Sequence, residues 1–465
     1  MTDYEPMLQP DKGQSAQMLH LVDTDSFDEW YKALPDRDRQ SVKAQAFKGK
    51  DGQLAIIAGE AADEWMVAVG VADAETLDSW CLAKAAEKLP SGTYRLDKGD
   101  PDEAAFGWLC AQYRFERYKQ EPTESNGPKV LLTSKPATIE ETIALAEATD
   151  LVRTLVNIPA GDMGPAELEN ATAEAATEFG AELTVTSGSD LVEGYPMVDA
   201  VGRAASEDRA PRLLELEWGD PKHPRIAIVG KGVCFDSGGL DIKGAAGMRW
   251  MKKDMGGAAH ALALARLVMG RGLPVRLHLL IPAVENAIAG NAFRPGDIIP
   301  SRKGLSVEIG NTDAEGRLIL GDALAKACED EPELVMDFAT LTGAARVALG
   351  PDLPALFTDD EALAAEISAA GMEIDDPVWR LPLWDGYDEW MKSPIADLSN
   401  TSSVPMAGAS TAALFLRRFV ASDIAWTHLD TFAWRNAPKP GRPKGGEALG
   451  LRAHWQVLKN RYANA

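Results

Sequence analysis

The second half of the chain alternates between two patterns of apolar residues. Strand-like runs rich in apolar residues occur at 225–230, 275–282, 334–339 and 355–358. Longer segments carry apolar residues at helical spacing, and these lie at 165–179, 256–269, 317–328 and 361–371. Such alternation is typical of an α/β sheet with helices on its faces. Ligands of these sheets bind beyond the carboxyl ends of the strands, so we expect a functional site at that edge.

Residues 1–137 predict a smaller α/β unit. Strand-like runs within it occur at 42–59, 65–71 and 129–133, and a helical pattern covers 73–89. Its charged residues are scattered as on a solvated surface, which favours a structural or assembly role. A long helical pattern over 138–157 connects this unit to a larger one at 158–465. We therefore predict an α/β fold in two domains, the larger with a central mixed sheet flanked by helices.

Length and charge change this picture little. A chain of 465 residues is too long for one ordinary core, which also favours two domains. The 47 basic and 71 acidic residues give a formal net charge of −24. A field of that sign repels phosphate backbones and anionic lipid, so we expect neither a nucleic-acid nor a membrane partner. The simplest explanation of the charge is an acidic, solvated surface.

Cysteine usage and the N-terminus bear on the cellular compartment. The four cysteines are widely spaced without a CxxC pair, which argues against a disulfide framework. The first residues are acidic and lack the apolar region of a signal peptide. No apolar run approaches the ~18 residues that suggest a membrane span. We expect a cytoplasmic protein.

The segment 311–318, with the sequence NTDAEGRL, concentrates charged residues beside small ones. Positions two apart in an extended segment point the same way, so Asp313 and Glu315 can converge on one ion. Taken alone, the segment would also suit a solvated turn.

A second charged cluster lies upstream and comprises Lys231, Asp236, Lys243 and Asp254. It begins just after the strand-like run at 225–230, where the sheet rule places a ligand site. Its glycines do not form a Walker loop, and Phe235 stands where a nucleophile elbow around Ser237 requires glycine. Asp254 alone has a second interpretation, because a carboxylate at the mouth of a helix is a common cap.

Together the two clusters supply four carboxylates. These groups raise one another's pKa if they share a buried cavity uncompensated, whereas two divalent cations would neutralise them. Lys231 could also bind a metal if burial and the ions depress its pKa enough to free the amine lone pair. Oxygen ligands with one amine suit Zn, Mn, Mg or Co more than an ion that prefers thiolates.

These segments closely resemble the leucyl (cytosol) aminopeptidases. The resemblance rests on VGKG at 229–232, FDSGG at 235–239, KDMGGAA at 253–259, GNAFRPGD at 290–297, NTDAEGRL at 311–318, ATLTGA at 339–344 and HLD at 428–430. It covers roughly residues 157–434 and implies that residues 158–465 form the catalytic domain. The family's fold has a smaller N-terminal α/β domain, which suits the size of residues 1–137.

The resemblance implies a role for each matching position. Asp236 and Glu315 would bridge two metal ions, Asp313 would bind one of them, and Lys231 and Asp254 would bind the other. Lys243 and Arg317 would be catalytic without binding metal, and Arg317 would hold a bicarbonate. Thr340, Leu341 and Gly343 would position the substrate, and Met251 would form a wall of the pocket for the first side chain.

The expected activity is removal of the N-terminal residue from unblocked peptides by water activated between two metals, Zn or Mn before Mg or Co. The family also implies a homohexamer. One departure concerns the pocket, because Phe432 stands near the position where better-known relatives carry a small residue. Two rival hypotheses are a non-catalytic binding or scaffold protein, which loss of a ligand would favour, and phosphoryl hydrolysis, which a phosphate loop would favour.

Overall fold

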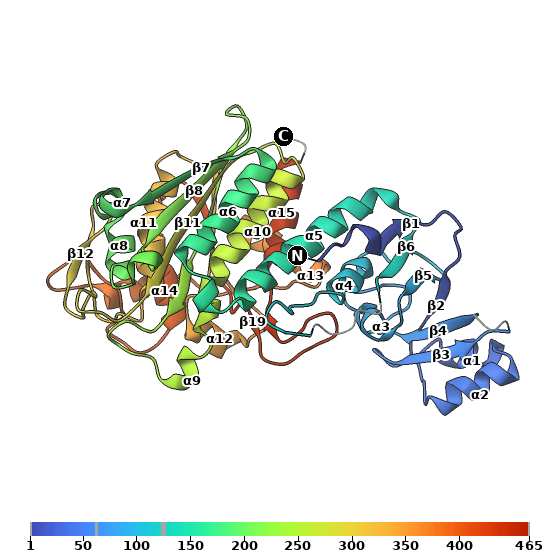
Figure 1. Ribbon diagram of the computed structural model, residues 1–465. Helices are drawn as coiled ribbons and strands as arrows, with labels where there is room; N and C mark the ends of the chain where they lie inside the picture. Colours follow the sequence, from blue (N-terminus) through green and yellow to red (C-terminus); the bar gives the residue numbers. More distant parts are fainter. Residues whose placement is uncertain (1, 61–63, 122–126, 464–465) are drawn as a thin grey trace. The chain divides into compact units, whose positions relative to one another are not determined.

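The computed structural model describes residues 2–60, 64–121 and 127–463 (Figure 1). Contacts divide it into two compact units, one of residues 1–150 with 436–444 and one of residues 151–435 with 445–465. Helix α5 (Ile139–Asn157) begins in the first unit and ends in the second. The α/β class and the two-domain organisation are therefore confirmed. Within the described residues, none of the helices combines the length and apolar character that crossing a bilayer requires.

The first unit is built on a six-stranded sheet of order β1-β6-β5-β2-β4-β3, in which only the β3–β4 pair is antiparallel. The strands are β1 (Leu8–Pro10), β2 (Gln17–Val22), β3 (Leu54–Ala58), β4 (Trp65–Gly70), β5 (Gly92–Leu96) and β6 (Lys129–Thr133). The helices are α1 (Phe27–Ala33), α2 (Asp36–Ala44), α3 (Ala83–Lys88) and α4 (Ala104–Cys110). The segment 436–444 joins this unit through Gly441, whose backbone N–H donates to Glu87 Oε1 at 2.8 Å.

The predicted helix at 73–89 was mostly wrong, because only α3 forms there. Asp73 Oδ1 accepts the backbone N–H groups of Glu75 and Thr76 at 2.8 and 3.2 Å, and Asp78 Oδ1 accepts that of Trp80 at 2.7 Å. Such local bonds offer the backbone turns in place of helical hydrogen bonds. The aspartates therefore delay the helix to residue 83.

The second unit has a nine-stranded mixed sheet of order β16-β15-β18-β14-β9-β11-β8-β7, with β10 pairing β11 beside this path. Its strands are β7 (Glu182–Ser187), β8 (Arg212–Trp218), β9 (Arg225–Gly230), β10 (Gly232–Asp236), β11 (Arg276–Asn286), β14 (Leu334–Ala339), β15 (Ala355–Phe357), β16 (Trp379–Arg380) and β18 (Ala425–Asp430). A small three-stranded sheet consists of β12 (Ile298–Pro300), β13 (Ser306–Glu308) and β17 (Leu398–Ser399). A two-stranded sheet consists of β19 (Trp434–Arg435) and β20 (Gly445–Gly446).

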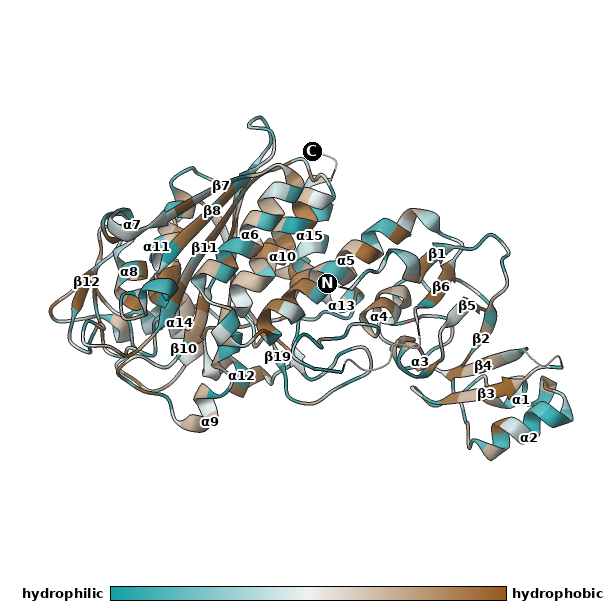
Figure 2. Cartoon of the chain, in the orientation of Figure 1, coloured by the Kyte–Doolittle hydropathy of each residue, from teal (hydrophilic) through white to brown (hydrophobic). Residues whose placement is uncertain are grey.

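Helices cover both faces of the large sheet (Figure 1). One layer contains α6 (Pro165–Phe179), α10 (Gly256–Gly270), α13 (Glu361–Glu373) and α15 (Leu451–Tyr462), and the other α8 (Pro196–Gly202), α11 (Gly316–Cys328) and α14 (Gly408–Arg417). Shorter helices are α7 (Gly188–Gly194), α9 (Ala245–Met248) and α12 (Gly343–Leu349). In Figure 2 strands β8 and β11 are brown, as expected for strands covered on both faces.

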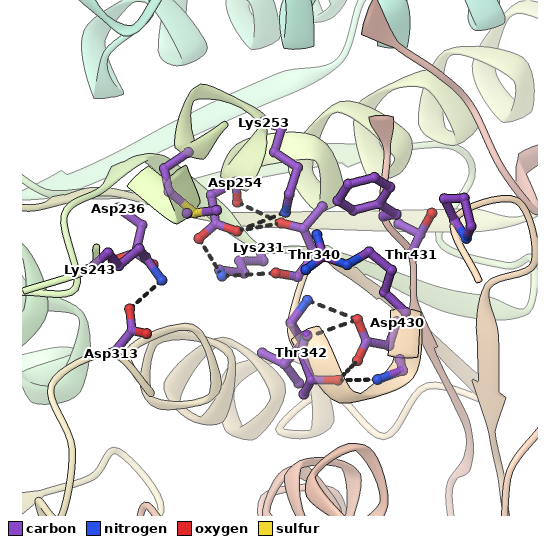
Figure 3. Close-up of a pocket in the computed structure, with 18 of the residues that line it drawn as sticks. Lys231, Asp236, Lys243, Lys253, Asp254, Asp313, Thr340, Thr342, Asp430 and Thr431 are labelled. Carbon is purple, nitrogen blue, oxygen red and sulfur yellow. Dashed lines mark hydrogen bonds and ion pairs between the residues drawn. The ribbon is translucent and has the colours of Figure 1, made fainter. Parts of the chain in front are cut away.

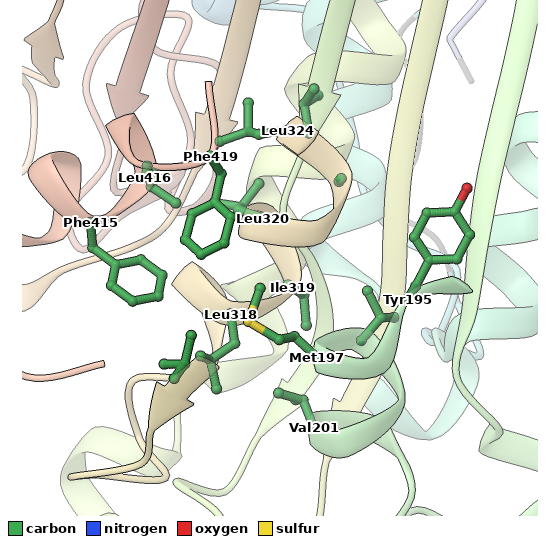
Figure 4. Packing of buried hydrophobic residues seen from close by; sticks show 14 of the residues in the cluster. Tyr195, Met197, Val201, Leu318, Ile319, Leu320, Leu324, Phe415, Leu416 and Phe419 are labelled. Carbon is green, nitrogen blue, oxygen red and sulfur yellow. The ribbon is translucent and has the colours of Figure 1, made fainter. Parts of the chain in front are cut away.

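A large apolar cluster lies between α8, α11, α14 and the sheet of the second unit. Figure 4 shows Met197 and Val201 of α8 facing Leu318 and Ile319 of α11, with Phe415 and Phe419 closing the other side. Burial of this kind stabilises by ~25 cal/mol per Å² of apolar surface. The first turn of α11 is thus fixed by packing, and with it the segment 311–318.

A buried carboxylate ties two of these helices together. Asp322 of α11 is fully buried, and its Oδ2 accepts the backbone N–H of Met197 at 2.8 Å and of Val198 at 3.4 Å. Its Oδ1 accepts the backbone N–H of Arg302 at 2.8 Å. Asp322 therefore satisfies donors at the start of α8 that helix geometry leaves unpaired.

Asp322→Ala is expected to lower the free energy of unfolding by about 2–4 kcal/mol, because buried N–H donors lose their acceptor. Urea denaturation of the full chain measures this change. Asp199→Ala on α8 is the matched control, since it removes a partly exposed carboxylate whose Arg203 partner lies at 3.4 Å and should cost under ~1 kcal/mol. Equal effects of the two variants would contradict the assigned role.

Candidate metal centre

The predicted site residues gather at the carboxyl ends of parallel strands. Lys231 directly follows β9, Asp236 is the last residue of β10, and Thr340 directly follows β14. Strands β9, β11 and β14 are parallel neighbours, so their carboxyl ends meet at one edge of the sheet. The short helix η5 (Met251–Met255) brings Asp254 to the same edge.

Three of the carboxylates converge. One oxygen each from Asp236, Asp313 and Glu315 lies within 4.8 Å of the others. Asp236 Oδ1 is fixed by Asn286 Nδ2 and by the backbone N–H of Gly238, both at 2.9 Å. Because these donors occupy Oδ1, Asp236 Oδ2 remains directed at the group of carboxylates.

Lys231 links the fourth carboxylate to this group. Its Nζ lies 2.5 Å from Asp254 Oδ2 and 3.1 Å from Glu315 Oε1, and it donates to the Thr340 carbonyl at 3.2 Å. Asp254 Oδ1 accepts from Thr340 Oγ1 at 2.8 Å. The N-cap of α10 is Met255 without a side-chain cap, so the interpretation of Asp254 as a helix cap was wrong.

Lys243 approaches the same group from the glycine-rich loop after β10. Its Nζ lies 2.7 Å from Asp236 Oδ2 and forms a second ion pair with Asp313 Oδ1 (Figure 3). Two lysines are thus paired with four carboxylates, so negative charge is in excess.

The segment 311–317 owes its shape to local contacts. Asn311 Oδ1 accepts the backbone N–H of Asp313 at 2.7 Å, and Glu315 is the N-cap of α11. A Cβ at Gly316 would lie 2.6 Å from Cε of Lys231, so a larger residue there would require the end of that side chain to move. The start of α11 therefore places Glu315 beside Lys231.

Arg317 lies in the first turn of α11, two positions after Glu315. It is partly buried, and its Nη1 donates to the Asn400 carbonyl at 2.7 Å. Burial lowers the pKa of its guanidinium to about 10, although the negative charge of Glu315 acts to raise that pKa. Among the described residues, it is the one predicted site residue that does not line the cavity around the carboxylates.

The carboxylates repel one another despite the lysines. Burial, followed by the charge of Asp236, raises the pKa of Glu315 to about 8 and that of Asp313 to about 6. Burial opposes the charged forms of Lys231 and Lys243, but the carboxylates outweigh it and raise both pKa values. A surplus of negative charge in a buried oxygen-rich cluster is the environment that a divalent cation favours.

A cavity of about 600 Å³ opens over the cluster. Its lining includes Lys231, Asp236, Lys243, Met251, Asp254, Asp313, Glu315, Thr340, Leu341 and Gly343, which the sequence analysis had all selected. Phe432 lines it as well, together with the cations Lys253 and Arg346. Asp430 fixes the backbone after β14, because its Oδ1 accepts the backbone N–H of Leu341 at 2.9 Å.

The residues that hold the candidate ligands were not predicted from the sequence. Asn286 fixes Asp236 and also donates to the Thr312 carbonyl at 3.1 Å, while Asn400 Nδ2 donates to the Asn311 carbonyl at 2.8 Å. Asn286 is the last residue of β11, and Asn400 directly follows β17. The position of Asn286 shortly after a predicted strand was the available signal for it.

Two family models match the chain. The model described as "Cytosol aminopeptidase family, catalytic domain" matches residues 150–454, and the one described as "M17 aminopeptidase, N-terminal domain" matches residues 18–128. The first alone covers more than half of the chain. The chain belongs to the cytosol aminopeptidase family.

Individual relatives of this cytosol aminopeptidase family member agree. A protein of Syntrophotalea carbinolica named "Probable cytosol aminopeptidase" is 40% identical over 369 residues, covering 76% of this chain and 73% of that protein. The crystal structure of the cytosol aminopeptidase of Coxiella burnetii superposes with a TM-score of 0.92 at 44% identity, covering 98% and 99% of the two chains. The bottromycin maturation enzyme BotP, solved in complex with Mn, gives 0.87 at 32% identity, covering 96% and 100%.

Family membership establishes the class of reaction. The chain is a metal-dependent aminopeptidase, as the sequence predicted, and it acts on peptides with divalent metal ions as cofactors. The rival hypothesis of a non-catalytic scaffold receives no support.

Proposed function

We propose that two divalent cations are held by Lys231, Asp236, Asp254, Asp313 and Glu315. The observation that carries this proposal is the convergence of Asp236, Asp313 and Glu315 within 4.8 Å at the cavity. In the proposed arrangement Asp236 and Glu315 would be ligands of both ions, Asp313 would be a ligand of one, and Lys231 with Asp254 would be ligands of the other. Lys231 would bind as the neutral amine, which a neighbouring dication favours.

The donor set supports Zn or Mn, with Mg and Co as further candidates. Carboxylate oxygens and one amine suit these ions, and no thiolate lines the cavity among the described residues. The Mn complex of BotP favours Mn in a related site. Divalent ions bound there would supply Lewis acidity that polarises a peptide carbonyl and activates water.

The chain's own residues would direct the reaction. Lys243 lines the cavity and reaches Asp236 and Asp313, so its ammonium can stabilise the oxyanion that develops on the attacked carbonyl. Thr340, Leu341 and Gly343 would orient the peptide, and Met251 would contact the first side chain. The free N-terminal amine would bind in the cluster of carboxylates.

Arg317 would hold a bicarbonate that assists proton transfer. Its partly buried guanidinium makes one hydrogen bond to a carbonyl, and no carboxylate lies within 4.0 Å of it among the described residues. A guanidinium with free donors is suited to a planar anion.

Assembly and location complete the proposal. The word cytosol in the relatives' names supports a cytoplasmic enzyme. The homohexamer is what the resemblance to the family implies. Size-exclusion chromatography with light scattering tests the assembly, and a monomer that is fully active would contradict it.

The activity itself is tested with Leu-Ala-NH2 and its N-acetylated form. We expect hydrolysis of the free peptide after addition of Mn or Zn, loss of that activity with a chelator, and no hydrolysis of the acetylated peptide, because acetylation removes the amine ligand. Mass spectrometry of the products measures each arm. Efficient cleavage of blocked or internal bonds would refute exopeptidase action.

A further inference from the structure

The charged side chains that line the cavity differ in how closely each is paired with a group of opposite charge. Five carboxylates and four cations line it, namely Asp236, Asp254, Asp313, Glu315, Asp430, Lys231, Lys243, Lys253 and Arg346. Lys231 and Lys243 pair with the four candidate metal ligands. Asp430 is saturated by the backbone N–H groups of Leu341 and Thr342 and by the Thr342 hydroxyl. Two cations, Lys253 and Arg346, therefore remain without a dedicated anion.

Lys253 is 6% exposed, yet it lacks a close carboxylate. The nearest carboxylate oxygen that the structure describes is Asp254 Oδ1, at 3.5 Å from its Nζ. That oxygen already accepts from Thr340 Oγ1, and 3.5 Å exceeds the ~2.8 Å of a charge-assisted hydrogen bond. A buried ammonium with so distant a partner is costly unless an anion approaches it.

Arg346 lies on α12, on the side of the cavity that Phe432 forms. It is exposed, and within the described part of the chain no carboxylate lies within 4.0 Å of its guanidinium. Its Cζ lies 4.8 Å from the centre of the Phe432 ring, and Lys253 Nζ lies 5.4 Å from the same centre. The ring thus holds two cations beside one compartment of the cavity.

We propose that this compartment recognises a carboxylate of the peptide substrate through Lys253 and Arg346, with Phe432 as the wall that positions both. The inference rests on the proposed aminopeptidase function of the same cavity and names its substrate class. Phe432 leaves no room in this compartment for a large side chain, and the two cations favour a negatively charged group there. Peptides that present a carboxylate to this compartment are then the preferred substrates.

The carboxylate has two possible sources. It belongs either to the side chain of an N-terminal Glu or Asp, or to the free C-terminus of a dipeptide. Both present the same planar anion to a guanidinium and an ammonium.

Two matched pairs of substrates distinguish the sources. Glu-Ala-NH2 against Gln-Ala-NH2 isolates the side-chain carboxylate, and Leu-Ala against Leu-Ala-NH2 isolates the C-terminus. We expect kcat/KM of the metal-loaded enzyme to favour the carboxylate member of at least one pair by about tenfold or more, the size of a hydrogen bond to a charged group. Ratios at or below one in both pairs, with Leu-Ala-NH2 still hydrolysed, would overturn the inference.

Variants assign the preference to its residues. Arg346→Gln should reduce the favoured ratio at least about fivefold, whereas Arg346→Lys should retain most of it because the charge remains. Lys253→Met should also reduce the ratio, and its metal content is measured because Asp254 is adjacent. Arg249→Gln is the control, since Arg249 is an exposed cation that stacks on Trp250 and lies outside the cavity lining.

The outcomes separate this inference from the function on which it rests. A preference that survives both Arg346→Gln and Lys253→Met would overturn the assignment while leaving the aminopeptidase intact. A metal-loaded protein that hydrolyses none of the four peptides would refute the proposed function and this inference with it.

Discussion

Glu315→Gln is expected to abolish peptide hydrolysis while the fold survives. The amide retains the shape of the side chain but removes a charge from a group of three carboxylates whose oxygens lie within 4.8 Å of one another. If Glu315 is a metal ligand as proposed, its loss should leave the enzyme depleted in metal and reduce turnover by at least ~10³, because activation of water and polarisation of the carbonyl would both depend on the ions. Asp313→Asn should act in the same direction. Metal analysis and kcat/KM for Leu-Ala-NH2 measure both effects.

The matched control for this variant lies at the other end of α11. Glu329 pairs with Arg302 at 2.6 Å on the exposed side of the helix, so Glu329→Gln makes the same chemical change away from the cavity. It should keep full metal content and activity. Full metal occupancy with normal turnover in Glu315→Gln would refute the assignment of Glu315 as a ligand.

Lys243→Ala is expected to retain both metals and lose ~10²–10³ in kcat, the usual cost of removing an oxyanion donor. Since Lys243 pairs with Asp236 and Asp313, its removal frees negative charge and should not weaken metal binding. Arg317→Ala should reduce kcat less, because in the proposed arrangement Arg317 holds a replaceable anion. The residual rate of this variant should respond little to added bicarbonate. Metal content and kcat, measured in parallel, separate catalysis from binding.

The contrary result is equally clear for these two residues. If Lys243 and Arg317 were ordinary surface cations, each would contribute under ~1 kcal/mol and would be dispensable. Near-normal activity of Lys243→Ala with both metals bound would therefore remove the proposed oxyanion role.

Elements with mostly apolar sequences were predictable from the chain. Strands β9 (Arg225–Gly230) and β14 (Leu334–Ala339) match the predicted limits, because each is a mostly apolar run that both helix layers cover. The helix at 73–89 was not predictable in the same way, since Asp73 and Asp78 bind nearby backbone N–H groups instead of continuing a helix. Local hydrogen bonding overrode periodicity there.

The candidate site was predictable where charged residues cluster in sequence and not where they meet through the fold. Asp313 and Glu315 lie two positions apart, so a short pattern reveals them. Asn286 reaches Asp236 across fifty positions through the pairing of β10 and β11, and the isolated amide gives no local sign of that partner. Lys253 and Arg346 likewise meet Phe432 only because three distant segments end at one cavity.

The spread of the candidate ligands along the chain, from Lys231 to Glu315, has a thermodynamic consequence. The donors come from four separate segments that approach one another only once β9, β10, η5 and α11 are in place. An unfolded chain therefore offers no comparable cluster, and ions would bind the native state almost exclusively. By linkage, each hundredfold excess of free metal over its dissociation constant adds ~2.7 kcal/mol to the stability of the second unit. Metal supply would thus set the lifetime of the folded enzyme as well as its activity.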